Sequence, residues 1–132
     1  MTTSRKTKAR RSTRIRYAVV GLGHIAQVAV LPAFAHAGSN SRLTALVSGD
    51  SKKLKELGTR YQVPYTYSYA QYDKCLRDGH IDAVYIALPN ALHHAAVLAA
   101  ARGKKHVLCE KPFAMTVAHA CEMVAAWRAA GG

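Results

Sequence analysis

Short apolar runs alternate along the chain with segments in which apolar residues recur at every third or fourth position. The short runs predict β-strands, and they lie at residues 15–20, 43–47, 63–67, 81–88 and 105–109. The longer segments predict helices, at residues 25–37, 51–61, 70–77, 91–102 and 116–130. Strands separated by helices in this way predict an open α/β fold, a doubly wound parallel sheet with helices on both faces.

An apolar run and two prolines refine this prediction. The run at residues 81–88 is almost continuously apolar, as expected for a parallel strand that is covered on both faces. Pro64 makes residues 63–67 a short edge strand, and Pro32 predicts a bend within the first helix.

Ligands of doubly wound sheets bind beyond the carboxyl ends of the strands. The residues expected at those ends are Val20, Val47, Leu88 and Cys109.

The first strand runs directly into a glycine-rich turn, Gly21–Ala26, which has the form G-x-G-x-x-A and opens a helix. The first glycine makes the turn, the second lets the backbone approach a pyrophosphate, and the alanine lets helix and strand pack closely. Helix N-termini also favour anions. We therefore predict a Rossmann-type dinucleotide-binding domain, with a glycine turn that serves only packing as the alternative. The cofactor contacts expected here are Gly21, Leu22, Gly23, His24 and Ile25.

The end of the second strand is expected to meet the adenosine ribose. NAD-specific domains place a carboxylate there, which would repel the 2′-phosphate of NADP, but this chain has Ser48 followed by Lys52 and Lys53. A hydroxyl and ammonium groups near a helix N-terminus favour a phosphate, so we expect NADP rather than NAD. Asp50 leaves an alternative open, as a ribose acid or as the helix cap, and the lysines can also form a solvated helix face.

Polar residues also follow the fourth and fifth strands. Asn90 can cap the next helix or offer its amide to a ribose, and His93 is either a packed residue or part of the cleft. Glu110 and Lys111 come directly after the fifth strand, where Pro112 biases Lys111 towards an extended backbone. Such a pair is commonly a surface ion pair. At the carboxyl end of a parallel strand it can also place an ammonium group near a reacting carbonyl or hydroxyl.

Composition narrows the possible partners. A chain of 132 residues suits one domain, and its longest apolar stretch is far shorter than the roughly 20 residues of a bilayer span. Much of the net charge of +12 lies in the first 16 residues, which contain no acid. We interpret residues 1–14 as a basic, disordered tail and residues 15–132 as the domain, without nucleic acid or membrane as a partner. A cytoplasmic, reducing location is expected, with no metal site and three cysteines that pack rather than pair.

The glycine turn, the Leu-Pro-Asn segment with its histidine, and the Glu-Lys-Pro segment, in this order and spacing, strongly resemble the Gfo/Idh/MocA oxidoreductase family. The resemblance covers residues 15–132 and is strongest to its glucose-fructose oxidoreductase branch. It implies that Ser48 and Lys53 hold the 2′-phosphate of NADP and that Tyr69 lies near the adenosine. The residues that it places along the dinucleotide cleft are Leu88, Pro89, Asn90 and His93.

The same resemblance implies an activity. Glu110 would help to position the nicotinamide side, and Lys111 would act as the catalytic residue that contacts substrate and cofactor close to the transferred hydride. The substrate would be a sugar or polyol, oxidised at a carbinol carbon. In the family, a second α/β domain carries the sugar site, the oligomer interface and the histidine expected as proton-transfer base.

We expect that second domain to be missing, so that the chain is a fragment that binds cofactor without turning over substrate alone. A homo-oligomer is then expected only of a full-length form. The alternative is a non-catalytic NAD(P)-binding sensor whose basic tail contacts nucleic acid.

Overall fold

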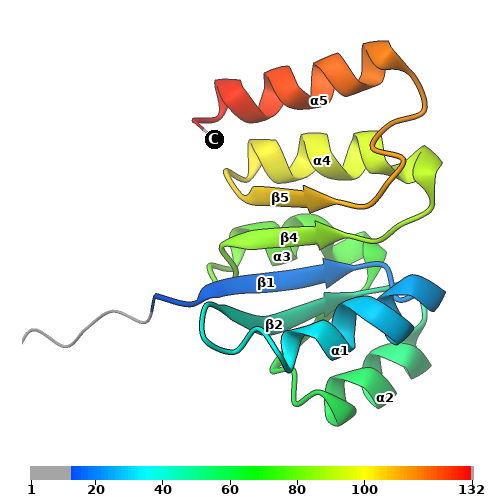
Figure 1. Ribbon diagram of the computed structural model, residues 1–132, viewed down its shortest axis with the longest axis vertical. Helices are drawn as coiled ribbons and strands as arrows, with labels where there is room; N and C mark the ends of the chain where they lie inside the picture. The colour runs from blue at the N-terminus through cyan, green and yellow to red at the C-terminus, as the bar shows by residue number, and fades with distance from the viewer. Residues whose placement is uncertain (1–12, 132) are drawn as a thin grey trace, which may run out of the picture.

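The computed structural model describes residues 13–131 and contains one five-stranded sheet (Figure 1). All four strand pairings are parallel, and the order is β3-β2-β1-β4-β5. The strands are β1 Ile15–Val20, β2 Ser41–Val47, β3 Tyr65–Tyr67, β4 Ala83–Ile86 and β5 His106–Cys109. The doubly wound fold and the edge position of β3 are thus confirmed. The predicted tail at residues 1–14 lies outside the described residues except for its last two.

Helices cover both faces of the sheet (Figure 1). Their bounds are α1 Leu31–Phe34, α2 Ser51–Arg60, α3 Tyr72–Arg77, α4 His93–Arg102 and α5 Val117–Ala129. One core packs α1 and α2 against the sheet, and a second core packs α3 and α4 against the opposite face. Val19 belongs to the first core while Ala18 and Val20 belong to the second, because successive side chains of a strand point to opposite faces. Helix α5 stacks on the outside of α4.

The first helix is shorter and less regular than predicted. The chain is helical from residue 24, but Ala26–Val30 forms a π-helical turn in which the Leu31 N–H donates to the Ala26 carbonyl. Pro32 has no N–H with which to continue the ladder, so the wider turn precedes it and it stands in the first turn of α1. The helix then ends at residue 34 rather than 37.

Other predicted boundaries also shift. The helices predicted at 70–77 and 91–102 each open with a 3-10 turn, Tyr69–Gln71 and Asn90–Leu92 respectively. The strand predicted at 81–88 pairs only from residue 83 to 86. Cys75 is buried as expected, but Cys121 is exposed, so the prediction of a packing role is wrong for that cysteine.

The described residues contain neither a membrane-spanning helix nor a cluster of metal ligands. Within residues 13–131, no helix combines the length and apolar character that crossing a bilayer needs. The same residues contain no group of three or more His, Cys, Asp or Glu side chains arranged to hold a metal ion.

Arg16 belongs to β1 and forms an ion pair with Asp82 just before β4. Its guanidinium donates to both carboxylate oxygens, at 2.9 Å to Oδ1 and 3.1 Å to Oδ2, and its backbone N–H donates to Oδ2 at 2.9 Å. These contacts hold the pKa of Asp82 below its ordinary value. Both side chains are about 40% exposed, which reduces the strength of the pair through solvent screening.

We expect Asp82→Asn to destabilise the fold at pH 7 by about 1 kcal/mol. Because the folded-state pKa of Asp82 is depressed, the contribution is present above the unfolded value of about 3.9 and is lost as the pH falls through the folded value. Urea unfolding at pH 7 and in acid measures this, with the exposed Glu56→Gln as control. If the variant and the wild type differ in free energy of unfolding by as much in acid as at pH 7, the stabilising role of the Arg16–Asp82 pair would be contradicted.

Candidate functional site

The strand order reverses between β1 and β4, and a crevice between their carboxyl ends is the usual ligand position in such a sheet. Gly21 lies at this point with φ +97°, a conformation that favours glycine. A Cβ on Gly21 would lie 2.7 Å from the Ala87 carbonyl oxygen. The first glycine of the motif is therefore needed both for its backbone angle and for the close approach of the two strand ends.

The rest of the glycine turn leaves room for a ligand. Gly23 is exposed, and a Cβ built there meets no atom within 4 Å. His24 and Ile25 are also exposed. Leu22 differs, because its side chain is only 2% exposed and belongs to the core, so that only its backbone is available to a ligand.

The end of β2 brings together the residues expected near the ribose. Ser48 is buried, and its Oγ accepts a hydrogen bond from the Asp50 N–H at 3.1 Å. Asp50 is the N-cap of α2, where its carboxylate accepts from the Lys53 N–H at 3.1 Å. Of the two roles left open for Asp50, the structure shows the helix cap. Lys53 stands in the first turn of α2, partly exposed.

Tyr69 lies against the segment that follows β2. A Cβ on Gly49 would come within 3.0 Å of the Tyr69 ring, so glycine lets the ring pack on the backbone. Burial raises the pKa of Tyr69, and a hydrogen bond with the Gly49 backbone lowers it by less. The ring also borders an apolar hollow of about 320 Å³. That hollow is lined by Val20, Tyr69, Tyr72, Leu88, Leu92, Ala95 and Ala96.

The residues after β4 contradict the expected cap by Asn90 and decide the role of His93. Asn90 makes no capping hydrogen bond: Pro89 occupies the cap position of the 3-10 turn and Leu92 that of α4, so the capping prediction is wrong. Its exposed side chain remains available to a ligand. His93 is fully buried, with both ring nitrogens facing backbone carbonyl oxygens. His93 is thus a packed residue, and its side chain has no surface in the cleft.

The end of β5 carries the Glu-Lys pair, but the two side chains do not pair with each other. The Glu110 carboxylate instead accepts a hydrogen bond of 2.5 Å from the Tyr85 hydroxyl of β4. Burial and this contact together raise the pKa of Tyr85 to about 12. Lys111 is exposed, and the peptide bond between Lys111 and Pro112 is cis. Sequence patterns did not predict the Tyr85 contact, because they indicated only that this residue belongs to a buried strand.

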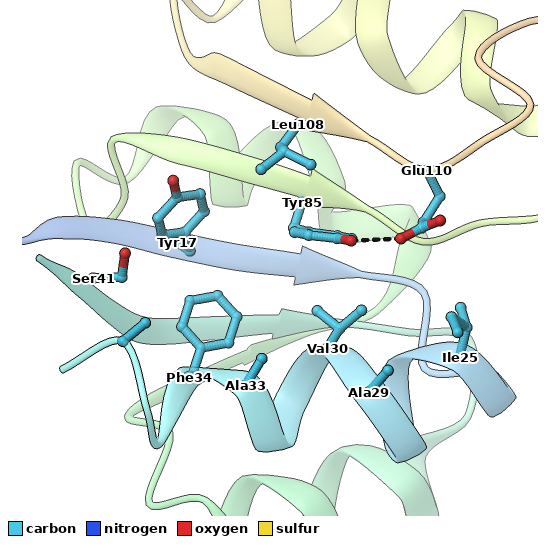
Figure 2. A pocket seen from close by; sticks show the side chains of 11 residues that line it. Tyr17, Ile25, Ala29, Val30, Ala33, Phe34, Ser41, Tyr85, Leu108 and Glu110 are labelled. Atoms are coloured by element: carbon cyan, nitrogen blue, oxygen red, sulfur yellow. Dashed lines mark hydrogen bonds between the residues drawn. The ribbon is translucent and has the colours of Figure 1, made fainter.

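Figure 2 shows where the Tyr85–Glu110 contact lies, at one side of an apolar pocket of about 280 Å³ between α1 and the sheet. Ile25 from the glycine turn borders the same pocket, so the pocket adjoins the predicted cofactor site. Its full lining is Tyr17, Ile25, Ala29, Val30, Ala33, Phe34, Ala37, Ser41, Tyr85, Leu108 and Glu110. Sequence patterns did not predict this pocket, because it depends on how α1 leaves the face of β4 and β5 uncovered.

Several known proteins are similar to this chain in fold and in sequence. The chain is 44% identical to an aldose-aldose oxidoreductase from Caulobacter crescentus, with a TM-score of 0.85 over 89% of this chain and 36% of that one. It is 35% identical to a 1,5-anhydro-D-fructose reductase from Ensifer adhaerens, over 88% of this chain and 34% of the relative. A D-xylose 1-dehydrogenase (NADP⁺) from Haloarcula marismortui is also 35% identical, over 83% and 31%.

The chain therefore spans about a third of the length of these relatives. Residues 15–132 match the model of the Gfo/Idh/MocA family, described as an oxidoreductase family with an NAD-binding Rossmann fold. With the glycine turn at the reversal of strand order and relatives of this similarity, the chain belongs to the Gfo/Idh/MocA oxidoreductase family.

Proposed function

We propose that this chain is the cofactor-binding domain of an NADP-dependent oxidoreductase that acts on a sugar or polyol. The observation that carries the choice of NADP is the end of β2. There Ser48 and Lys53 flank the start of α2, while the carboxylate of Asp50 is engaged as the helix cap. A hydroxyl, an ammonium group and a helix N-terminus together favour the 2′-phosphate that distinguishes NADP from NAD.

In this proposal the dinucleotide lies along the crevice at the carboxyl ends of the strands. The open space above Gly23 leaves room for the pyrophosphate at the start of the first helix. Tyr69 and the apolar hollow beside it suit the adenosine end. Asn90 offers a free amide in between, and Glu110 lies at the nicotinamide end, where Tyr85 fixes its orientation.

NADP, when bound, supplies the hydride acceptor. The residues of this chain bind and orient the cofactor and the substrate. We assign Lys111 to the substrate, because it is an exposed cation at the carboxyl end of β5 whose ammonium group can donate to a substrate hydroxyl or carbonyl oxygen. The sugar or polyol class rests on the relatives, whose names include a D-xylose dehydrogenase and an anhydrofructose reductase.

We expect no turnover by these 132 residues alone. Carbinol oxidation needs a group that accepts the hydroxyl proton, and His93, which packs against the segment that carries Lys111, is buried with both ring nitrogens engaged. His93 is therefore not the base in this proposal.

Calorimetric titration with NADPH and, separately, NADH tests the proposal, with circular dichroism to confirm folding. We expect NADPH to bind at least about 100-fold more tightly, equivalent to two hydrogen bonds to the charged 2′-phosphate at about 1.5 kcal/mol each. A folded chain that binds neither dinucleotide would contradict the proposal. Equal affinities would keep the cofactor domain and remove the preference for NADP.

A further inference from the structure

His93 joins the segments that follow β4 and β5. Its Nε2 lies 2.8 Å from the Leu88 carbonyl oxygen, at the end of β4. On the other side, its Nδ1 lies 3.0 Å from the Pro112 carbonyl oxygen and 3.3 Å from that of Phe113. The ring is 0% exposed. One buried side chain therefore bridges the two segments that carry the residues assigned above to the cleft.

An imidazole carries a nitrogen on each side of its ring, so one side chain can face carbonyl oxygens of two separate segments. The two ring nitrogens of His93 face the Leu88 carbonyl on one side and the Pro112 and Phe113 carbonyls on the other. Because the ring is fully buried, a side chain without this shape would leave buried polar groups without partners, which destabilises the arrangement.

We propose that His93 is a positioning residue, whose buried ring holds the segment after β5 against the end of β4. Glu110 also has contacts of its own, since its N–H donates to the Ile86 carbonyl at 3.0 Å and its carboxylate accepts from Tyr85, so the His93 contacts act most directly on the exposed Lys111 and the residues after it. Cys109 adds a weak contact of 3.9 Å from its Sγ to the Phe113 carbonyl oxygen. The consequence for cofactor binding rests on the function proposed above, whereas the bridge itself does not.

The neighbouring titratable groups do not offer the ring another partner. Cys109, Glu110 and Lys111 lie on the segment that His93 contacts, but Glu110 is bonded to Tyr85. On the same helix, the His94 ring stacks on that of His119 with 4.1 Å between centroids, and its Nε2 lies 2.7 Å from Glu122. Among the described residues, the hydrogen-bond partners of the His93 ring are backbone carbonyls alone.

Long-range ¹H–¹⁵N NMR of the cofactor-free, 132-residue chain tests the bridge without any substitution. We expect a ring N–H of His93 that is observed directly and exchanges slowly with solvent, because the ring is fully buried between backbone carbonyl oxygens. A ring N–H that exchanges as fast as that of an exposed imidazole would overturn the proposal.

The variant His93→Gln tests the positioning role, since an amide group places its donors at one end and cannot serve carbonyls on both sides. We expect the Glu110 amide, whose N–H donates to the Ile86 carbonyl at 3.0 Å, to lose at least about tenfold of its protection from exchange, and the affinity for NADPH to fall about tenfold. His94→Gln, which removes the adjacent imidazole without touching Leu88 or Pro112, is the matched control and should change neither. Equal exchange rates of the Glu110 amide in the His93→Gln and His94→Gln variants would overturn the proposal.

The two readouts separate this proposal from the proposed function. If the wild-type chain fails to bind NADPH, the proposed function fails, while amide exchange and the His93 ring N–H signal of the cofactor-free protein still decide the bridge. If His93→Gln does not fold, the exchange rate of the His93 ring N–H in the wild type decides it.

Discussion

Alanine at position 23 should leave the protein folded and weaken NADPH binding by at least about 100-fold, or about 2.7 kcal/mol. A Cβ at Gly23 meets no atom of the protein within 4 Å, so the folded state accepts it without a clash. Alanine also restricts the unfolded chain, which makes the change neutral or slightly stabilising. In the proposed complex, the same methyl group would occupy the space that the pyrophosphate needs. Thermal unfolding and calorimetric titration of the variant measure the two effects separately.

Gly21→Ala is the matched comparison at the other glycine of the turn. Its Cβ would lie 2.7 Å from the Ala87 oxygen and 2.9 Å from the Ala87 carbonyl carbon, at a backbone φ of +97°. We expect this variant to lose about 3 kcal/mol of stability or more, from strain and displacement of the end of β4. Binding would be lost with it. If Gly23→Ala binds NADPH as tightly as the wild type, the turn serves packing only and the pyrophosphate site is wrong.

The contrast between these glycines shows why part of the site was predictable. Gly21–Ala26 is a local motif: its strand, turn and helix are adjacent in the sequence, so the pattern contains the geometry. The cap of α2 by Asp50 is equally local, because donor and acceptor are three residues apart. Alternation of apolar runs also predicted the parallel sheet, although not where each strand stops pairing.

Contacts between distant segments were not predictable. Tyr85 and Glu110 are 25 residues apart, and His93 and Pro112 are 19 apart; both contacts depend on β5 lying beside β4. Sequence patterns left His93 between a packed residue and a cleft residue, and its complete burial decides for packing. Asn90 failed as a cap for a related reason, since a 3-10 turn precedes α4 and moves the start of the helix to His93.

Replacing Ser48 and Lys53 together with alanine should reverse much of the discrimination between cofactors. Both side chains lie at the start of α2, where the 2′-phosphate is expected. Loss of two hydrogen bonds to a charged group, at about 1.5–3 kcal/mol each, predicts NADPH binding weaker by at least about 100-fold. NADH has only hydroxyl groups on that ribose, so its affinity should change by less than about threefold. Paired titrations of variant and wild type measure the ratio.

The matched control is Lys55→Ala, which removes a lysine of the same helix that lies beyond its first turn and is exposed. If the effect came from net charge alone, Lys55→Ala would weaken NADPH binding as much as the loss of Lys53 does. Added salt would then reduce the contributions of the two lysines equally. A local phosphate site predicts otherwise, because only a group at the helix N-terminus adds a directed hydrogen bond to the favourable dipole. Equal losses of affinity for NADPH and NADH in the double variant would instead mean that the two residues support folding or contact both dinucleotides alike. That result would contradict the 2′-phosphate site.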